Sequence, residues 1–324
     1  MKRLLAVVAS VGMIVVAVVI RSHLDASSTS VTARGNNASG PLTVVCVTEL
    51  RAACDALASS HPELHTRVED ASVTALALAK GHDVIDGWLT LDPWPDIANG
   101  LLSEPVITAE SALASSPLVI AMVKERAAVL APACPGGTIG WKCLGDNVGR
   151  RWTELTGGVQ AWGNITVGLP PAGSAAGVLL FGNAVSGYFG RADIATNDFE
   201  NDDAFAAWRA KVAGTFSESD PFLPFVQQLP AKYAAVGVTQ AEEQAGVGAR
   251  ADQITIVQPT PAATAIVVLA PIGSGARATQ VEKLAAAPAL LDALKQAGWA
   301  VGQAPPQTGL PAPGVLLALS GLHP

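Results

Sequence analysis

Residues 117–123, which read PLVIAMV, form an uninterrupted apolar run. At seven residues the run has the length of a strand rather than of a helix, and it predicts a buried strand. Toward the N-terminus, short strands and helices alternate, which is typical of an α/β fold with a mostly parallel sheet. We expect strands at 42–47, 65–68 and 83–89, and helices at 52–59 and 73–80.

A second α/β unit follows the apolar run. Its expected strands are 138–143, 165–169 and 235–239, and its expected helices are 173–189, 203–213 and one that starts at Gln240. Strands at 254–257 and 265–269 come next, before a helix at 280–297 and a short helix at 314–322. The length is sufficient for two lobes with cores of their own, and residues 259–261 (PTP) are a plausible return connection between them.

The composition narrows the class of protein. Of 324 residues, 50% are apolar and 15% are charged, which excludes a disordered chain and a coiled coil. The formal net charge of −7 argues against binding to nucleic acid, because nucleic-acid-binding proteins need a basic surface.

Motifs for catalysis and for cofactors are scarce. The sequence holds five His and no nucleophile elbow, P-loop or HExxH motif. Residues 273–278 (GSGARA) match GxGxxA between an expected strand and a helix, but no acid-bearing strand follows, so we interpret them as a glycine-rich connector. The acids at 198–203 lack the EF-hand spacing and suit a helix N-terminus. We therefore expect a protein that is not an enzyme, with no cofactor and no metal site.

The N-terminal residues have the form of an export signal. Lys2 and Arg3 precede an uncharged apolar run at 4–20, which spans roughly 26 Å against a bilayer core of about 30 Å. Segment 1–24 is therefore either a cleaved signal peptide or a membrane anchor, and residues 25–40, rich in Ser, Thr, Asn and Gly, are expected to form a flexible tether. The basic start predicts an extracytoplasmic protein, anchored to the membrane or secreted.

The four cysteines fit an exported protein. They fall in two close pairs, Cys46 with Cys54 and Cys134 with Cys143, and neither pair has CxxC spacing. In an oxidising compartment, pairing of neighbours is the simplest of three connectivities. Four buried free thiols are the alternative.

Several segments, taken in order, carry a resemblance to a known family. They are 42–50 (LTVVCVTEL), 87–94 (GWLTLDPW), 115–120 (SSPLVI), 162–177 and 310–316 (LPAPGVL). In this order they resemble extracellular solute-binding proteins of the type 2 periplasmic-binding-protein fold, most closely the branch also found fused to a von Willebrand factor A domain.

The resemblance implies two lobes joined by two crossover strands, with a ligand cleft between them. Lobe I is expected at 41–119 and 262–324, and lobe II at 120–261. The implied function is capture of a small polar or anionic solute, for an ABC-type permease or for sensing. The alternative is a cell-envelope interaction or assembly module that keeps the fold without a transported ligand.

Hydroxyl side chains at strand-to-helix junctions are the first candidates for the cleft, because ligands of α/β proteins bind beyond the carboxyl ends of strands and near helix N-termini. Family members that bind oxyanions use hydroxyls and amides at such junctions. Each of these hydroxyls is either a ligand contact or a helix cap. The four are Thr48, Ser72, Ser174 and Thr239.

Charged and aromatic residues complete the set of candidates. Glu49, next to Thr48, would repel an anion in the cleft and favour a cationic or polar ligand. Trp88, Trp94 and Tyr188 either line the cleft or pack in the core.

Overall fold

Strand β4 (Ser111–Val123) runs through both halves of the fold. In the computed structural model, its residues up to Pro117 pair with β8 (Thr264–Pro271), and its residues from Leu118 pair with β6 (Ala235–Thr239). The apolar run that the sequence marks as a strand is thus the second half of a longer one. The strand changes partner between residues 117 and 118, two positions before the lobe boundary that is predicted between residues 119 and 120.

The structure describes residues 40–81, 84–229, 231–302, 305 and 308–322. The predicted signal or anchor at 1–24 and the predicted tether, apart from residue 40, lie outside the described residues. Among the helices of the described ranges, none is long and apolar enough to cross a bilayer.

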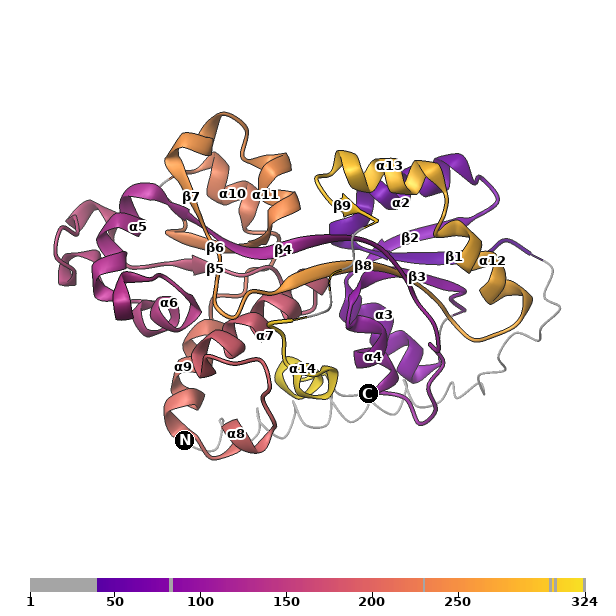
Figure 1. Ribbon diagram of the computed structural model, residues 1–324, viewed down its shortest axis with the longest axis horizontal. Helices are drawn as coiled ribbons and strands as arrows, with labels where there is room; N and C mark the ends of the chain where they lie inside the picture. Colours follow the sequence, from indigo (N-terminus) through magenta and orange to yellow (C-terminus); the bar gives the residue numbers. More distant parts are fainter. Residues whose placement is uncertain (1–39, 82–83, 230, 303–304, 306–307, 323–324) are drawn as a thin grey trace, which may run out of the picture. The chain divides into compact units, whose positions relative to one another are not determined.

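Lobe I is built on the part of the sheet in which the strands have the order β2-β1-β3-β8-β4. Strands β1 (Thr43–Val47), β2 (His65–Glu69) and β3 (Gly87–Asp92) are parallel, and the short β9 (Ala300–Val301) pairs with β4. Figure 1 shows α2 and α13 on one face of this sheet and α3 and α4 on the other. The helical segments of this lobe are η2 (Thr48–Leu50), α2 (Arg51–Ser60), α3 (Ala71–Lys80), α4 (Trp94–Asn99), α12 (Ala276–Leu284) and α13 (Pro288–Gln296).

Lobe II uses the second half of β4 with β6, β7 (Ile254–Val257) and β5 (Val167–Gly168). Its α-helices are α5 (Lys124–Leu130), α6 (Trp141–Asn147), α7 (Ala175–Phe189), α8 (Asn197–Glu200), α9 (Asp203–Ala213), α10 (Phe222–Gln227) and α11 (Gln240–Gly246). The last helix of the described chain, α14 (Pro313–Ser320), contacts both α4 and α7.

Strands β4 and β8 lie side by side between the lobes and are the two crossover strands (Figure 1). Two α/β lobes joined in this way have the type 2 periplasmic-binding-protein-like fold, as the resemblance implies. The sheet is less parallel than expected, because both crossover strands pair antiparallel to their neighbours. Two passages between the lobes in opposite directions require this.

Two predicted elements are wrong. Residues 138–143 form no strand, because Trp141 begins helix α6 and its indole Nε1 donates a 2.8 Å hydrogen bond to Asn183 Oδ1 on α7. The predicted helix at 280–297 is two helices, α12 and α13, and Pro288 starts the second. Proline lacks the N–H that a continuous helix would need there, and its ring suits the first turn of a new helix.

Both neighbour disulfides are present. Cys46 in β1 is bonded to Cys54 in α2, and Cys134 is bonded to Cys143 in α6. The first bridge closes the chain around η2, which comes directly after β1. It therefore braces the segment that carries Thr48 and Glu49.

Candidate ligand-binding cleft

A cavity of about 540 Å³ lies between the two lobes. Its size falls within the range of small-molecule sites in proteins. Its wall combines carboxyl and hydroxyl groups with a smaller number of apolar side chains. The lining residues are Thr48, Glu49, Asp70, Pro170, Pro171, Ser174, Ala176, Glu218, Ser219, Asp220, Thr239, Glu242, Ala245, Ala297 and Trp299.

Lobe I supplies its polar groups from the carboxyl ends of parallel strands. Thr48 and Glu49 follow β1, and Asp70 follows β2. Because β1 and β2 are adjacent and parallel, their ends meet at one edge of the sheet. The hydroxyl of Thr48 donates to Asp70 Oδ1 at 3.1 Å and lies 3.2 Å from Glu49 Oε2, which groups the three side chains.

Lobe II presents the N-terminus of α7 to the cavity, and two of the backbone donors at this N-terminus are already bound within the protein. Ser174 is the N-cap, and its Oγ accepts a 3.0 Å hydrogen bond from Gly177 N. The next free donor, Ala176 N, donates to Glu49 Oε1 at 2.7 Å. A carboxylate of lobe I therefore occupies the position at which a helix N-terminus would hold an anionic ligand.

The charge of the cavity wall is strongly negative. Five of the lining residues are carboxylic acids and none is Lys, Arg or His. Burial raises the pKa of Glu242 well above its ordinary value, and the neighbouring Asp220 and Glu49 raise it further. Burial also raises the pKa of Glu49, against the hydrogen bond from Ala176 that lowers it. Both side chains stay partly exposed because they face the cavity.

Four of the sequence candidates line this cavity. They are Thr48, Glu49, Ser174 and Thr239. Ser174 and Thr239 are helix caps as well as lining residues, since Thr239 Oγ1 accepts a 3.2 Å hydrogen bond from Glu242 N. For these two positions, the cap and the cleft location coincide.

Four candidates lie elsewhere. Ser72 is outside the cavity wall, and its backbone N donates to Gly173 O at 3.0 Å. Trp88 and Trp94 are fully buried in the core, where their rings pack edge-on against each other. Tyr188 belongs to an aromatic cluster of lobe II with Phe189, Phe205 and Trp208.

Eleven of the fifteen lining residues were not candidates from the sequence. Those with a carboxyl group or an aromatic ring are Asp70, Glu218, Asp220, Glu242 and Trp299. Asp70 carried a usable signal, because it stands between an expected strand and an expected helix, as Thr48 does. Glu218 and Asp220 lie in an irregular segment before α10, and no local pattern indicates that this segment folds toward the cleft.

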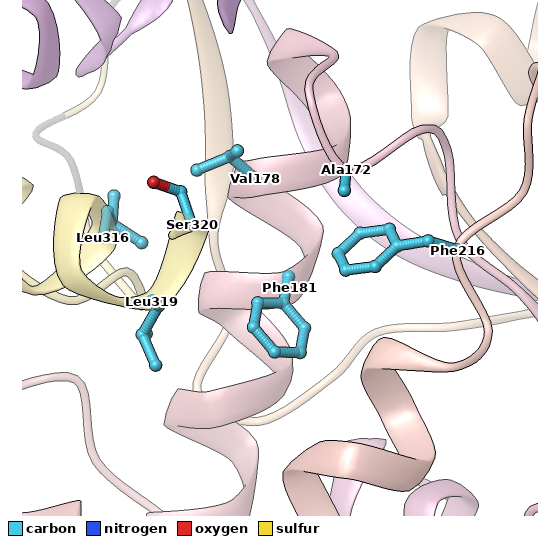
Figure 2. A pocket seen from close by; sticks show the side chains of 7 residues that line it. All are labelled: Ala172, Val178, Phe181, Phe216, Leu316, Leu319 and Ser320. Atoms are coloured by element: carbon cyan, nitrogen blue, oxygen red, sulfur yellow. The ribbon is translucent and has the colours of Figure 1, made fainter. Parts of the chain in front are cut away.

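A second cavity is too small to be a ligand site. It has a volume of about 30 Å³ and lies among apolar side chains of α7, α14 and Phe216 (Figure 2). A space of this size holds a water molecule at most, and apolar cavities of this kind stay dry. It is a packing gap where α14 meets α7.

The GxGxxA match has a structural role in the described chain. Arg277, which belongs to the GSGARA segment, forms a bidentate ion pair with Asp86. Its Nε lies 2.6 Å from Asp86 Oδ1, and its Nη2 lies 2.5 Å from Asp86 Oδ2. Asp86 Oδ2 also accepts a hydrogen bond from Thr43 N. The pair ties α12 to the edge where β1 and β3 begin.

Comparisons with known proteins give likeness of fold. No protein-family model matches the chain, and no curated protein matches it by sequence. The sulfate-binding protein SubI from Mycobacterium tuberculosis is 14% identical, over 81% of this chain and 86% of that one, with a TM-score of 0.49. The periplasmic binding protein P5PA is 12% identical, over 85% and 90%, with a TM-score of 0.49. A hydrogen peroxide-bound mutant of OxyR from Corynebacterium glutamicum is 16% identical, over 88% and 73%, with a TM-score of 0.47.

Proposed function

We propose that this protein is an exported solute-binding protein that captures a small polar solute between its two lobes. The observation that carries the proposal is the cavity of about 540 Å³, to which both lobes contribute polar side chains. Ligand binding between lobes that close by a hinge is an established use of such an architecture.

Hydrogen bonds across the cleft support a closing motion. The first turn of α7 and the residue Gly173 before it form three hydrogen bonds with lobe I. Gly173 O accepts from Ser72 N, and Ala175 O accepts from Trp94 Nε1 at 3.2 Å. Ala176 N donates to Glu49. All three bonds use the backbone of residues 173–176. A short, well-defined contact of this kind can break and re-form as the lobes move.

The open cavity favours a ligand over the alternative of an envelope assembly module. A module that had lost its ligand would be expected to fill the cleft with its own side chains, as close-packed interiors do. We infer binding rather than catalysis, since the Ser174 hydroxyl is used as the cap of α7, where it accepts from Gly177 N, and neither His nor Lys of the described chain lines the cavity to activate it.

Export, tethering and delivery to a permease or sensor belong to this proposal. The apolar run at 4–20 supports export, and the two disulfides support an oxidising compartment outside the cytoplasm. Fractionation of cells that express the full chain, with and without an alkaline carbonate wash, separates an anchored protein from a released one.

A screen of small solutes tests the binding function. We expect at least one solute class to raise the melting temperature, because binding to the folded state stabilises it by mass action. The same solute should reduce the radius of gyration in small-angle scattering as the lobes close. A broad screen with no thermal shift and no change in dimensions would contradict the proposal.

A further inference from the structure

The negative wall of the cavity extends over both lobes. Glu49 and Asp70 stand on lobe I, and Glu218, Asp220 and Glu242 stand on lobe II. Within the described part of the chain, none of the five forms an ion pair with Lys or Arg. Elsewhere in the same structure Asp86 does have such a partner, Arg277. The carboxylates of the cavity therefore face one another without a built-in counter-charge.

Two of these carboxyls act on the protonation of a third. Burial raises the pKa of Glu242 most, and the charges of Asp220 and Glu49 raise it further. Like charges held together in a partly buried site are unfavourable unless a proton or a cation compensates them. The mutual repulsion of these carboxyls costs stability, so we infer that the arrangement serves what enters the cavity.

Anions are excluded by the same geometry. The backbone donor with which α7 could hold an oxyanion, Ala176 N, is bound by Glu49, and the next, Gly177 N, is bound by Ser174. An incoming sulfate or phosphate would have to displace a carboxylate of the protein and then lie among four others. The hydroxyls of Thr48, Ser174 and Thr239, which suggest an oxyanion site in the sequence, are thus used within the protein.

The cavity suits an organic cation better than a bare metal ion. Among the described residues, no three His, Cys, Asp or Glu side chains are placed to hold one metal ion. The volume of about 540 Å³ exceeds what an ion needs. Trp299 and two prolines, Pro170 and Pro171, give the wall an apolar portion, and an indole also attracts an ammonium group through its π-face.

We propose that the cleft binds an organic ammonium compound, with Glu242 and Glu49 as the residues that select for positive charge. The inference rests on the proposed solute-binding function and specifies its ligand class. An ammonium group between the lobes neutralises carboxylates of both, which favours the closed arrangement. Glu49 has two roles, because its Oε1 occupies the helix N-terminus and its negative charge faces the cavity.

The test is a binding panel of matched probes on the full-length protein. The cations are 1,4-diaminobutane, spermidine and choline chloride, the anions are sodium sulfate and sodium phosphate, and glucose is the neutral probe. We expect at least one ammonium compound to bind and the anions to leave the melting temperature unchanged. Affinity for the ammonium compound should fall as ionic strength rises, because salt screens the attraction.

Charge-removing variants connect the binding to the cavity. Glu242→Gln and Glu49→Gln should each weaken ammonium binding at least tenfold, whereas Glu200→Gln, which removes an exposed carboxylate on α8, should leave it unchanged. Circular dichroism of every variant checks that it is folded, and Glu242→Gln serves alone if Glu49→Gln does not fold.

The outcomes separate the two claims. If glucose, sulfate or phosphate binds the wild type and the ammonium compounds do not, the ligand class is wrong and the solute-binding function stands. If ammonium compounds bind equally well to the Glu242 variant and to the wild type, the selection by this site is overturned. If no probe and no solute of the broader screen binds, both proposals fail.

Discussion

Glu49 Oε1 accepts a 2.7 Å hydrogen bond from the backbone N of Ala176, so a carboxylate of lobe I caps a helix of lobe II. The bond joins the two lobes directly at one side of the cleft. It also gives helix α7 an internal anion at its positive end, where charge and dipole attract each other. The same contact therefore links the packing of the lobes to the charge that a solute meets.

Substitution of Glu49 should separate the hydrogen bond from the charge. Glu49→Gln keeps an acceptor for Ala176 N and removes a charge that burial disfavours, as the raised pKa of this carboxyl indicates. We expect its free energy of unfolding at pH 8 to equal or exceed that of the wild type. Glu49→Ala loses the cap, and we expect a loss of about 1 kcal/mol. Urea unfolding of the three proteins measures the difference, and equal losses in both variants would contradict it.

Proton release should accompany binding of a cation. Burial raises the pKa of Glu242 in the free protein, and the charges of Asp220 and Glu49 raise it further. Glu218 and Asp70 are the other carboxyls that line the cavity. An ammonium group favours the charged carboxylate and lowers that pKa, so protons leave as the ligand enters. Affinity should therefore increase as the pH rises toward the free-state pKa of Glu242. Titration calorimetry in two buffers of different ionisation enthalpy, neither with a free ammonium group, counts the protons.

The stability of the free protein should change with pH in the opposite direction. In the folded state the pKa values of Glu242 and Glu49 are raised above the ordinary 4.5. At pH values between 4.5 and these raised values, the folded state therefore binds more protons than the unfolded state. Stability is thus highest with the two groups protonated and falls as the pH rises through their folded pKa values. Glu242→Gln should reduce this dependence, and an unchanged pH profile together with unchanged proton release would show that Glu242 is not the titrating group.

The two disulfides offer a matched pair of variants. Their loops are nearly equal, with sequence separations of 8 and 9, so loss of either bridge should cost a similar free energy, about 2–3 kcal/mol. Only Cys46–Cys54 spans η2, which carries Glu49 into the cleft. Replacing Cys46 and Cys54 by Ala should weaken solute binding, whereas the same change at Cys134 and Cys143 should lower stability alone. Equal affinities in the two double variants would show that η2 needs no bracing.

Local patterns predict much of this structure. Helix α9 and strands β6 and β7 occupy the residues expected, because each combines a clear periodicity with flanking turn or cap residues. The error at 138–143 has a tertiary cause, since the contact of Trp141 with Asn183 joins residues 42 positions apart. No window of local sequence contains that contact.

The site is predictable only where it follows strand ends. Thr48, Glu49, Ser174 and Thr239 all stand at junctions that the strand–helix order marks, and the structure places all four in one cavity wall. Trp88 is near the end of the strand predicted at 83–89, but β3 is Gly87–Asp92, so Trp88 lies at the beginning of the strand and is buried in the core. Glu218 and Asp220 reach the wall from an irregular segment, so only the folded chain reveals that the cleft is acidic on both sides.

Closure of the cleft should depend on the absence of a side chain at Gly298. This residue, between α13 and β9 of lobe I, has φ +87°, and an added Cβ would lie 2.9 Å from Ala241 O on α11 of lobe II. Gly298→Ala should therefore hold the lobes apart and weaken solute binding several-fold.

Gly302→Ala is the control, because Gly302 has φ +73° with no atom within 4 Å of the added Cβ. Both variants carry backbone strain, but only the first meets the opposite lobe. Scattering with saturating ligand should show a larger radius of gyration for Gly298→Ala than for Gly302→Ala. Equal dimensions and equal affinities would mean that binding does not require this approach of the two backbones.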